Sequence, residues 1–203
     1  NKPWVGDSMK MPTVALVGRP NVGKSTLFNK LVGKKISIIE DTPGVTRDRI
    51  YSEVSYGNYR YNLIDTGGID VSNEVFNDEI KVQVAIAIDE ADVIVFVVDG
   101  KEALTSNDLY VRDMLRSSKK KVIVAINKVD NKESREHEYD FYELGFDYYI
   151  RISGEHSIGI RELQDEITKD FKYYENDASD ARLKFSIIGR PNVGKSSLVN
   201  ALL

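Results

Sequence analysis

The sequence predicts a three-layer α/β domain, built on a mainly parallel six-stranded sheet with one antiparallel edge strand. Apolar, β-branched runs such as residues 93–98 carry no polar alternation, which is typical of strands buried on both faces. Segments with helical spacing of apolar residues separate these runs, as in parallel sheets. Gly57-Asn58 joins two shorter strand-like segments as a two-residue hairpin, which supplies the antiparallel pair.

The order of elements follows from the same patterns. We expect strands at residues 13–17, 50–56, 59–64, 93–98, 121–126 and 148–152. Helices are expected at residues 26–32, in a segment ending near residue 90, and at 107–116, 133–144 and 160–173. Residues 33–49 show no period and predict a long loop, of a length usually associated with function.

Composition restricts the classes of function. The 203 residues are 41% hydrophobic with a formal net charge of −4, so net charge does not indicate a nucleic-acid binder. The chain has no cysteine, which excludes disulfides and thiolate metal sites. No apolar run approaches the roughly 20 residues of a membrane span, and we expect a cytoplasmic protein. Residues 1–10 are interpreted as an expression-tag remnant and N-terminal extension, with Met9 or Met11 as the native start.

A phosphate-binding loop follows the first strand. Residues 18–25 match the pattern G-x-x-x-x-G-K-[ST] between a predicted strand and a predicted helix. Backbone amides around the glycines would surround a polyphosphate, Lys24 would contact its β- and γ-phosphates, and the Ser25 hydroxyl would ligate Mg²⁺. A chance glycine turn is the alternative. The predicted loop comprises Gly18, Arg19, Pro20, Asn21, Val22, Gly23, Lys24, Ser25 and the following Thr26.

Two later segments predict that the base is guanine. Asn127, Lys128, Val129 and Asp130 directly follow the strand at residues 121–126, at the sheet edge where α/β ligands bind. Asp130 can accept hydrogen bonds from guanine N1–H and the 2-amino group, which adenine cannot supply. Asn127 would tie this segment to the phosphate loop, and the Lys128 stem would cover the base. Main-chain N–H groups of Ser153 and Gly154 would back the base, although Ser-Gly is also an ordinary turn.

Asp65, Thr66, Gly67 and Gly68 end another hydrophobic strand. Asp65 would hold Mg²⁺ through water, and the Gly67 N–H would contact the γ-phosphate. Within residues 33–49, Thr46 is the candidate that completes the magnesium coordination, with Thr42 as the alternative. Loss of the γ-phosphate would release both segments, which predicts a nucleotide-dependent switch.

The end of the chain repeats its beginning. Residues 174–182 are acidic, small and polar, and are interpreted as a linker between a first domain at 11–173 and a truncated second domain at 183–203. The second copy repeats the phosphate loop, with the corresponding residues Gly189, Asn192, Gly194, Lys195 and Ser196.

These motifs together resemble the translation-factor-related GTPases, and the tandem loops with residues 41–49 (DTPGVTRDR) resemble the EngA/Der family. The resemblance implies a P-loop GTPase domain with GTP or GDP and Mg²⁺ as ligands. It also implies a role in assembly of the large ribosomal subunit, with RNA bound by a KH-type domain outside this sequence.

The resemblance also implies a potassium ion. Ile69 occupies the position where many small GTPases carry a catalytic glutamine, and an aliphatic side chain cannot orient water. In related GTPases an asparagine matching Asn21 helps to hold K⁺; the alternative is that Asn21 only supports the loop. The expected catalytic set is then Asn21, Lys24, Thr46 and Gly68, and the expected metal ligands are Ser25, Thr46, Asp65 and Asn21.

The predicted function is a GTP-hydrolysing switch. A weakly hydrolysing regulatory module that docks to the ribosome or to its sister domain is the alternative of another class. An ATP-driven motor or transport domain conflicts with residues 127–130. We expect the aromatic residues between 139 and 149 to pack a helix onto the sheet rather than to stack on RNA, and residues 119–121 to be a solvated lysine run.

Overall fold

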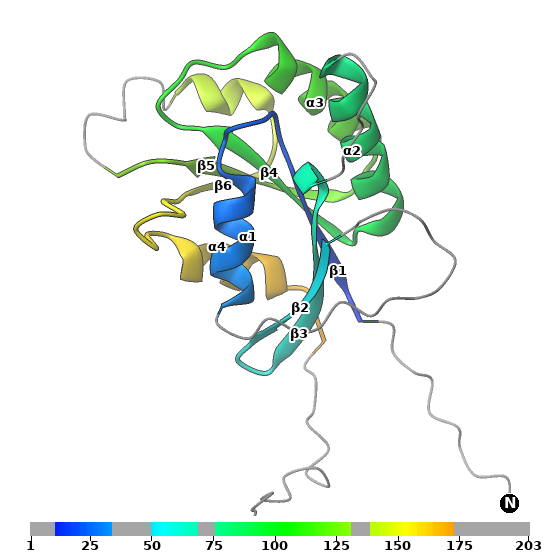
Figure 1. The fold of residues 1–203 in the computed structure, drawn as a ribbon, viewed down its shortest axis with the longest axis vertical. Coiled ribbons are helices and arrows are strands. Elements are labelled where there is room, and N and C mark those ends of the chain that lie inside the picture. Colours follow the sequence, from blue (N-terminus) through cyan, green and yellow to red (C-terminus); the bar gives the residue numbers. More distant parts are fainter. Residues whose placement is uncertain (1–10, 34–49, 69–75, 131–138, 173–203) are drawn as a thin grey trace, which may run out of the picture.

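The computed structural model describes residues 11–33, 50–68, 76–130 and 139–172. These residues form the predicted three-layer α/β domain (Figure 1). The six strands are β1 (Thr13–Val17), β2 (Ile50–Tyr56), β3 (Tyr59–Asp65), β4 (Val93–Asp99), β5 (Lys121–Asn127) and β6 (Tyr148–Arg151). The helices are α1 (Lys24–Val32), α2 (Phe76–Glu90), α3 (Ser106–Ser117) and α4 (Ile160–Thr168), with 3-10 helices η1 (Thr66–Gly68) and η3 (Asp140–Leu144).

The strand order is β2-β3-β1-β4-β5-β6. Every neighbouring pair is parallel except β2 and β3, which form the antiparallel hairpin expected from Gly57-Asn58. Strand β1 lies between β3 and β4. After β1 the chain first adds β2 and β3 on one side of it, and then β4, β5 and β6 on the other side. Such a reversal point is where ligands bind in open α/β sheets, at the carboxyl ends of the strands.

Each face of the sheet is covered by its own helices. Alternate residues of β4 divide between two apolar clusters: Val95 packs with α1 and α4, and Phe96 packs with α2 and α3. All seven residues of β4 are buried, as predicted for a strand covered on both faces. The central strands therefore form a rigid base beneath their carboxyl ends.

Local signals explain where two helices begin. Helix α3 starts with a capping box, in which Thr105 accepts from the Asp108 amide and the Asp108 side chain accepts from the Thr105 amide. Helix α1 instead starts at Gly23, whose φ of 94° lies in the left-handed region, with no side-chain cap. No side chain at the cap position therefore accepts a hydrogen bond from the first amides of α1.

Two predicted helices differ from the structure. The helix expected at 133–144 is described only from residue 139, and there η3 is a 3-10 helix that ends at Gly145 with φ 69°. Helix α4 ends at Thr168 rather than near residue 173, because the Phe171 amide turns back to the Thr168 carbonyl. Phe171 then packs on Tyr61, with ring centroids 6.0 Å apart. The end of α4 is therefore decided by a contact with a distant strand.

The aromatic and lysine expectations hold only in part. Phe141 is buried and Tyr149 packs partly on the same core, but Tyr139 and Tyr142 are exposed. The lysine run is not simply solvated, since Lys120 donates to the Ala91 carbonyl and Lys121 donates to the Glu166 carbonyl. Among the described residues no helix is long and apolar enough to cross a membrane.

Candidate functional site

Most of the residues predicted to bind ligand lie at the carboxyl ends of neighbouring parallel strands. The sheet register pairs Leu16 with Asp65 and Asp99 with Asn127, so the phosphate loop, the Asp65 segment and the base motif meet at one edge. In Figure 1, α1 begins immediately beyond this edge. The topology alone therefore brings together motifs that are up to about a hundred residues apart in sequence.

Two glycines of the phosphate loop are required by close contacts. A Cβ on Gly18 would lie 2.3 Å from the Val97 carbonyl oxygen, and one on Gly23 would lie 2.3 Å from Asn127 Nδ2. Lys24 is 6% exposed, and its Nζ donates to the Gly18 and Arg19 carbonyls at 2.7 and 2.9 Å. The loop thus folds closely around a buried ammonium group.

The predicted magnesium ligands are neighbours. Ser25 Oγ donates to Asp65 Oδ2 at 3.1 Å, and the Gly67 amide donates to Asp65 Oδ1 at 2.9 Å. Thr66 Oγ1 donates to the Leu16 carbonyl at 2.6 Å and thereby anchors this segment to β1. A hydroxyl and a carboxylate in contact, with Asp65 only 4% exposed, are the oxygen donors that Mg²⁺ prefers.

Asn127 joins three segments. Its Nδ2 donates to the Val22 carbonyl at 2.8 Å, which is the tie to the phosphate loop that the sequence predicts. Its Oδ1 accepts from the Gly154 amide at 3.0 Å. Asn127 is 3% exposed, so losing either bond would leave a buried polar group unpaired. This side chain therefore fixes the spacing between the phosphate loop and the predicted base subsite.

The amides expected to back the base have other partners. The Gly154 amide is used by Asn127, and the Ser153 amide donates to the Ile158 carbonyl within a tight turn. In this structure the turn at residues 153–158 closes on itself, and the contact of these amides with a base stays a prediction. Instead, the Ser153 side chain takes part, donating from Oγ to Asp130 Oδ1 at 2.6 Å.

Asp130 is held by two donors. Besides Ser153, Lys101 Nζ donates to Asp130 Oδ2 at 2.7 Å. The bond from Lys101 is the main cause that holds the pKa of the Asp130 carboxyl below its usual value, and the bond from Ser153 acts in the same direction. Asp130 is therefore a carboxylate, an acceptor of hydrogen bonds only, at neutral pH.

Asp99 at the end of β4 and the following Gly100 make contacts that no sequence motif predicts. Asp99 accepts from Lys128 Nζ at 2.5 Å, while Lys128 Nζ also donates to the Asn21 carbonyl at 2.8 Å. The Gly100 amide donates to the Asn127 carbonyl at 2.7 Å. A polar residue at the carboxyl end of β4, beside the base motif, was the available signal.

Arg19 belongs to the phosphate loop by sequence, but its side chain faces the start of α3. It pairs with Glu102 at 2.6 Å and with Asp108 at 3.3 Å. Asp108 is 2% exposed and also closes the capping box of α3. The side chain of Arg19 thus links the phosphate loop to a helix, whereas we expected it among the ligand-binding residues.

The remaining predicted residues fall into two groups. Asn21 is exposed with φ 65°, Thr26 is exposed on α1, and Val22 is fully buried. Pro20 lies between Arg19 and Asn21 in the loop, Gly68 ends η1, and the Val129 amide donates to the Ile152 carbonyl. Outside the described residues lie the alternative Thr42 and the predicted Thr46, Ile69, Gly189, Asn192, Gly194, Lys195 and Ser196.

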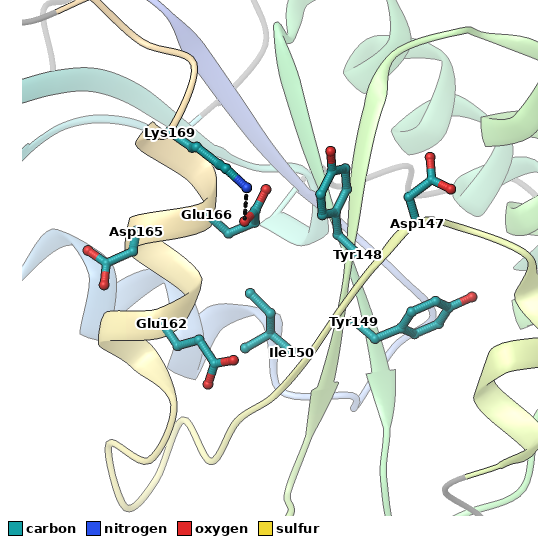
Figure 2. Close-up of a pocket in the computed structure, with 8 residues that line it drawn as sticks. All are labelled: Asp147, Tyr148, Tyr149, Ile150, Glu162, Asp165, Glu166 and Lys169. Atoms are coloured by element: carbon teal, nitrogen blue, oxygen red, sulfur yellow. Dashed lines mark hydrogen bonds and ion pairs between the residues drawn. The ribbon is translucent and has the colours of Figure 1, made fainter.

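A separate pocket lies between β6 and α4 (Figure 2). Glu162, Asp165 and Glu166 line it from α4, Lys169 lines it directly after the helix, and Tyr148 and Ile150 line it from β6. Figure 2 shows Tyr149 pointing away from α4, on the opposite side of β6. None of the predicted site residues lines this pocket, so it is not part of the candidate site.

A sequence model of the family described as 50S ribosome-binding GTPase matches residues 13–128 and 184–203, more than half of the chain. The chain belongs to this family. The segment 184–203 falls on the second copy of the phosphate loop. Within this GTPase family, the predicted resemblance to EngA/Der is confirmed by curated relatives named GTPase Der.

GTPase Der of Staphylococcus saprophyticus is 56% identical over 196 residues, which are 96% of this chain and 45% of the relative. GTPase Der of Macrococcus caseolyticus is 53% identical with the same coverage. The chain therefore spans less than half the length of the curated relatives it matches.

Solved structures share the fold. A variant of Aquifex aeolicus Era bound to GDP and AlF4⁻ has a TM-score of 0.63 and 29% identity, covering 79% of this chain and 57% of that chain. The G domain of the T. maritima iron transporter FeoB has a TM-score of 0.60 and 29% identity, covering 79% of this chain and 98% of that chain. The P-loop GTPase fold predicted from the motifs is thus confirmed.

Proposed function

We propose that this domain binds GTP and GDP with Mg²⁺ and hydrolyses GTP to GDP and phosphate, changing conformation with the nucleotide. The observation that carries the proposal is the position of Asn127. It contacts the Val22 carbonyl of the phosphate loop at 2.8 Å and lies three residues before the base-reading Asp130. Membership in the GTPase family and the Era structure with GDP and AlF4⁻ support it.

In this proposal the phosphate subsite uses Lys24 and the loop amides. Lys24 supplies a positive charge to the β- and γ-phosphate oxygens, and the N-terminus of α1 adds its partial charge. Ser25 and Asp65 fit Mg²⁺ because their oxygens already lie 3.1 Å apart. The metal would neutralise charge on the phosphates. The Gly67 amide would give up its hydrogen bond to Asp65 and donate to a γ-phosphate oxygen instead, and Thr46 would approach the same phosphate. Release of these two contacts after hydrolysis is the proposed switch.

Asp130 would select guanine. Its carboxylate accepts two hydrogen bonds and offers none, which matches the N1–H and 2-amino donors of guanine. Replacing Asp130 by Asn turns one acceptor into a donor, so Asp130→Asn should weaken GDP binding by about 100-fold or more and favour xanthosine diphosphate. Competition of GDP, XDP and ADP for both proteins measures this preference. An unaltered preference for GDP in the variant would show that Asp130 does not read the base.

Asn21 would help to hold K⁺ near the transferred phosphoryl group. Among the described residues no hydrogen bond involves its side chain, and its left-handed backbone leaves that side chain exposed. An amide oxygen suits a monovalent cation, which would offset charge developing between the β- and γ-phosphates. Hydrolysis should then be faster in KCl than in NaCl at equal ionic strength, and Asn21→Ala should remove the difference. Equal wild-type rates in the two salts would exclude this role.

The biological setting proposed is assembly of the large ribosomal subunit, on the basis of the family's description. Cosedimentation with purified large subunits or their precursors in GTP and in GDP tests this contact. Single-turnover hydrolysis in K⁺ distinguishes the enzyme from the alternative, a regulatory module that binds nucleotide and barely hydrolyses it. A rate no higher than that of free GTP would favour the regulatory module.

A further inference from the structure

Lys101 is held against the base-reading carboxylate by its own backbone as well as by its side chain. Its amide donates to Asp99 Oδ1 at 3.0 Å, and the preceding Gly100 amide donates to the Asn127 carbonyl at 2.7 Å. A Cβ on Gly100 would lie 2.8 Å from that carbonyl, so the backbone approaches the base motif as closely as a glycine permits. This attachment places Lys101 Nζ 2.7 Å from Asp130 Oδ2.

Both oxygens of Asp130 therefore have donors within the protein. Ser153 Oγ donates to Oδ1 at 2.6 Å, and Lys101 Nζ donates to Oδ2. Guanine offers two donors to the same carboxylate, whose two oxygens have about four acceptor sites, and Ser153 and Lys101 already take one on each oxygen. We propose that Lys101 is a built-in competitor of the guanine ring for Asp130, which slows entry of the base and lowers affinity. The inference rests on the proposed function, because it assumes that Asp130 reads guanine.

Of the two donors, Lys101 is the one that can leave. Ser153 is fully buried, and its Oγ also accepts from the His156 amide at 3.2 Å. The Lys101 side chain is 54% exposed on a flexible stem, and water can solvate its ammonium when it leaves. The bond to Asp130 raises the pKa of Lys101 and lowers the pKa of Asp130, so both groups are charged throughout the neutral range.

The test compares three variants of the 203-residue chain in stopped-flow binding of a fluorescent GDP analogue labelled on the ribose. Lys101→Met keeps the length of the side chain and removes its charge, Lys101→Arg keeps the charge, and Lys30→Met on α1 controls for the loss of one positive charge. Loss of an exposed ion pair of this kind should change the equilibrium constant for binding the nucleotide by about two- to five-fold. Lys101→Met should associate faster and bind tighter by this factor, while Lys101→Arg and Lys30→Met should stay near the wild type.

Salt gives a second readout that a merely structural role would not produce. Ions screen the exposed Lys101–Asp130 pair, so raising the salt from about 50 mM to about 500 mM should shrink the advantage of Lys101→Met. Equal binding by Lys101→Met and Lys30→Met would overturn the inference. Weaker binding by Lys101→Met would also overturn it, because Lys101 would then hold the nucleotide. If the folded wild type binds no GDP analogue, the proposed function fails and the inference fails with it.

Discussion

At the scale of single residues, the site depends on backbone positions that admit no side chain. Gly23 shows this most clearly, because its missing Cβ leaves the space that Asn127 Nδ2 occupies. The left-handed backbone at Gly23 and the contact from a strand more than a hundred residues later both require glycine. The phosphate loop and the base motif are therefore coupled through one atom.

Gly23→Ala should destabilise the domain more than left-handed backbone strain alone. The strain costs about 1 kcal/mol, and displacing the buried Asn127 amide from the Val22 carbonyl adds roughly 1–3 kcal/mol. Urea denaturation followed by circular dichroism measures the loss. Gly57→Ala is the control, because Gly57 also has a positive φ, of 57°, but a Cβ there would meet nothing within 4 Å. Equal losses in the two variants would show that Asn127 yields without cost.

A site residue could be predicted from the sequence only where it belongs to a short motif. Ser25, Asp65 and Asn127 were predicted because each belongs to a short sequence motif with a known binding role. Lys101 was not, because nothing in its neighbouring sequence shows that Gly100 approaches Asn127. The contact of the Arg19 side chain with Asp108 was not predicted for the same reason, since Asp108 lies in a helix 89 residues away. Contacts between loops of distant origin require the assembled sheet.

At the scale of elements, strands were predicted more closely than helices. The strands β1 and β2 have the predicted bounds, and the other four differ by one residue at one end. Buried strands end within a residue of the end of their apolar runs, which are visible in the sequence. The ends of α4 and η3 depend instead on packing and on turns, as the contact between Phe171 and Tyr61 shows. Periodicity alone extends such helices too far.

Lys121 connects β5 to α4 through a hydrogen bond to the Glu166 carbonyl and through two ion pairs, which contribute to stability only while the carboxylates are charged. Its Nζ lies 3.1 Å from Glu166 and 2.8 Å from Asp170. Asp170 has a lowered pKa because of Lys121, so its contribution is present above the unfolded pKa of about 3.9 and is lost as the pH falls through the lower folded value. Lys121 has a raised pKa; burial opposes the shift, and the bonds to Asp170 and Glu166 outweigh it. Its contribution is present below the unfolded pKa of about 10.4 and is lost as the pH rises through the higher folded value.

Lys121→Met should therefore lower the free energy of unfolding by about 1 kcal/mol at pH 7, and the difference should become smaller near pH 2, where the hydrogen bond to the Glu166 carbonyl remains. Urea denaturation at the two pH values gives both numbers. Lys119→Met, at an exposed neighbouring lysine, should change little at either pH. A loss by Lys121→Met that persists unchanged at pH 2 would mean that the hydrogen bond to the Glu166 carbonyl, rather than the two ion pairs, stabilises α4.

At the scale of the whole molecule, one sheet serves two cores. Leu163 of α4 belongs to the cluster on one face, and Leu115 of α3 belongs to the cluster on the other. Both clusters share strands β4 and β5, whose successive residues alternate between them. Loss of either core would expose the opposite side of the same strands. The candidate site, at the carboxyl ends of these strands, depends on both.

This sharing predicts that the two faces unfold together. Leu115→Ala and Leu163→Ala should each cost about 2–5 kcal/mol, since both leucines are almost fully buried. Each variant should still show a single transition, with an unchanged dependence on urea and coincident curves from circular dichroism and tyrosine fluorescence. If Leu163→Ala instead separated an early transition from a late one, α4 and its cluster would form an independent unit. The geometry of the site could then be lost without global unfolding, because Ser153 and Gly154 reach the base motif from the segment that leads into α4.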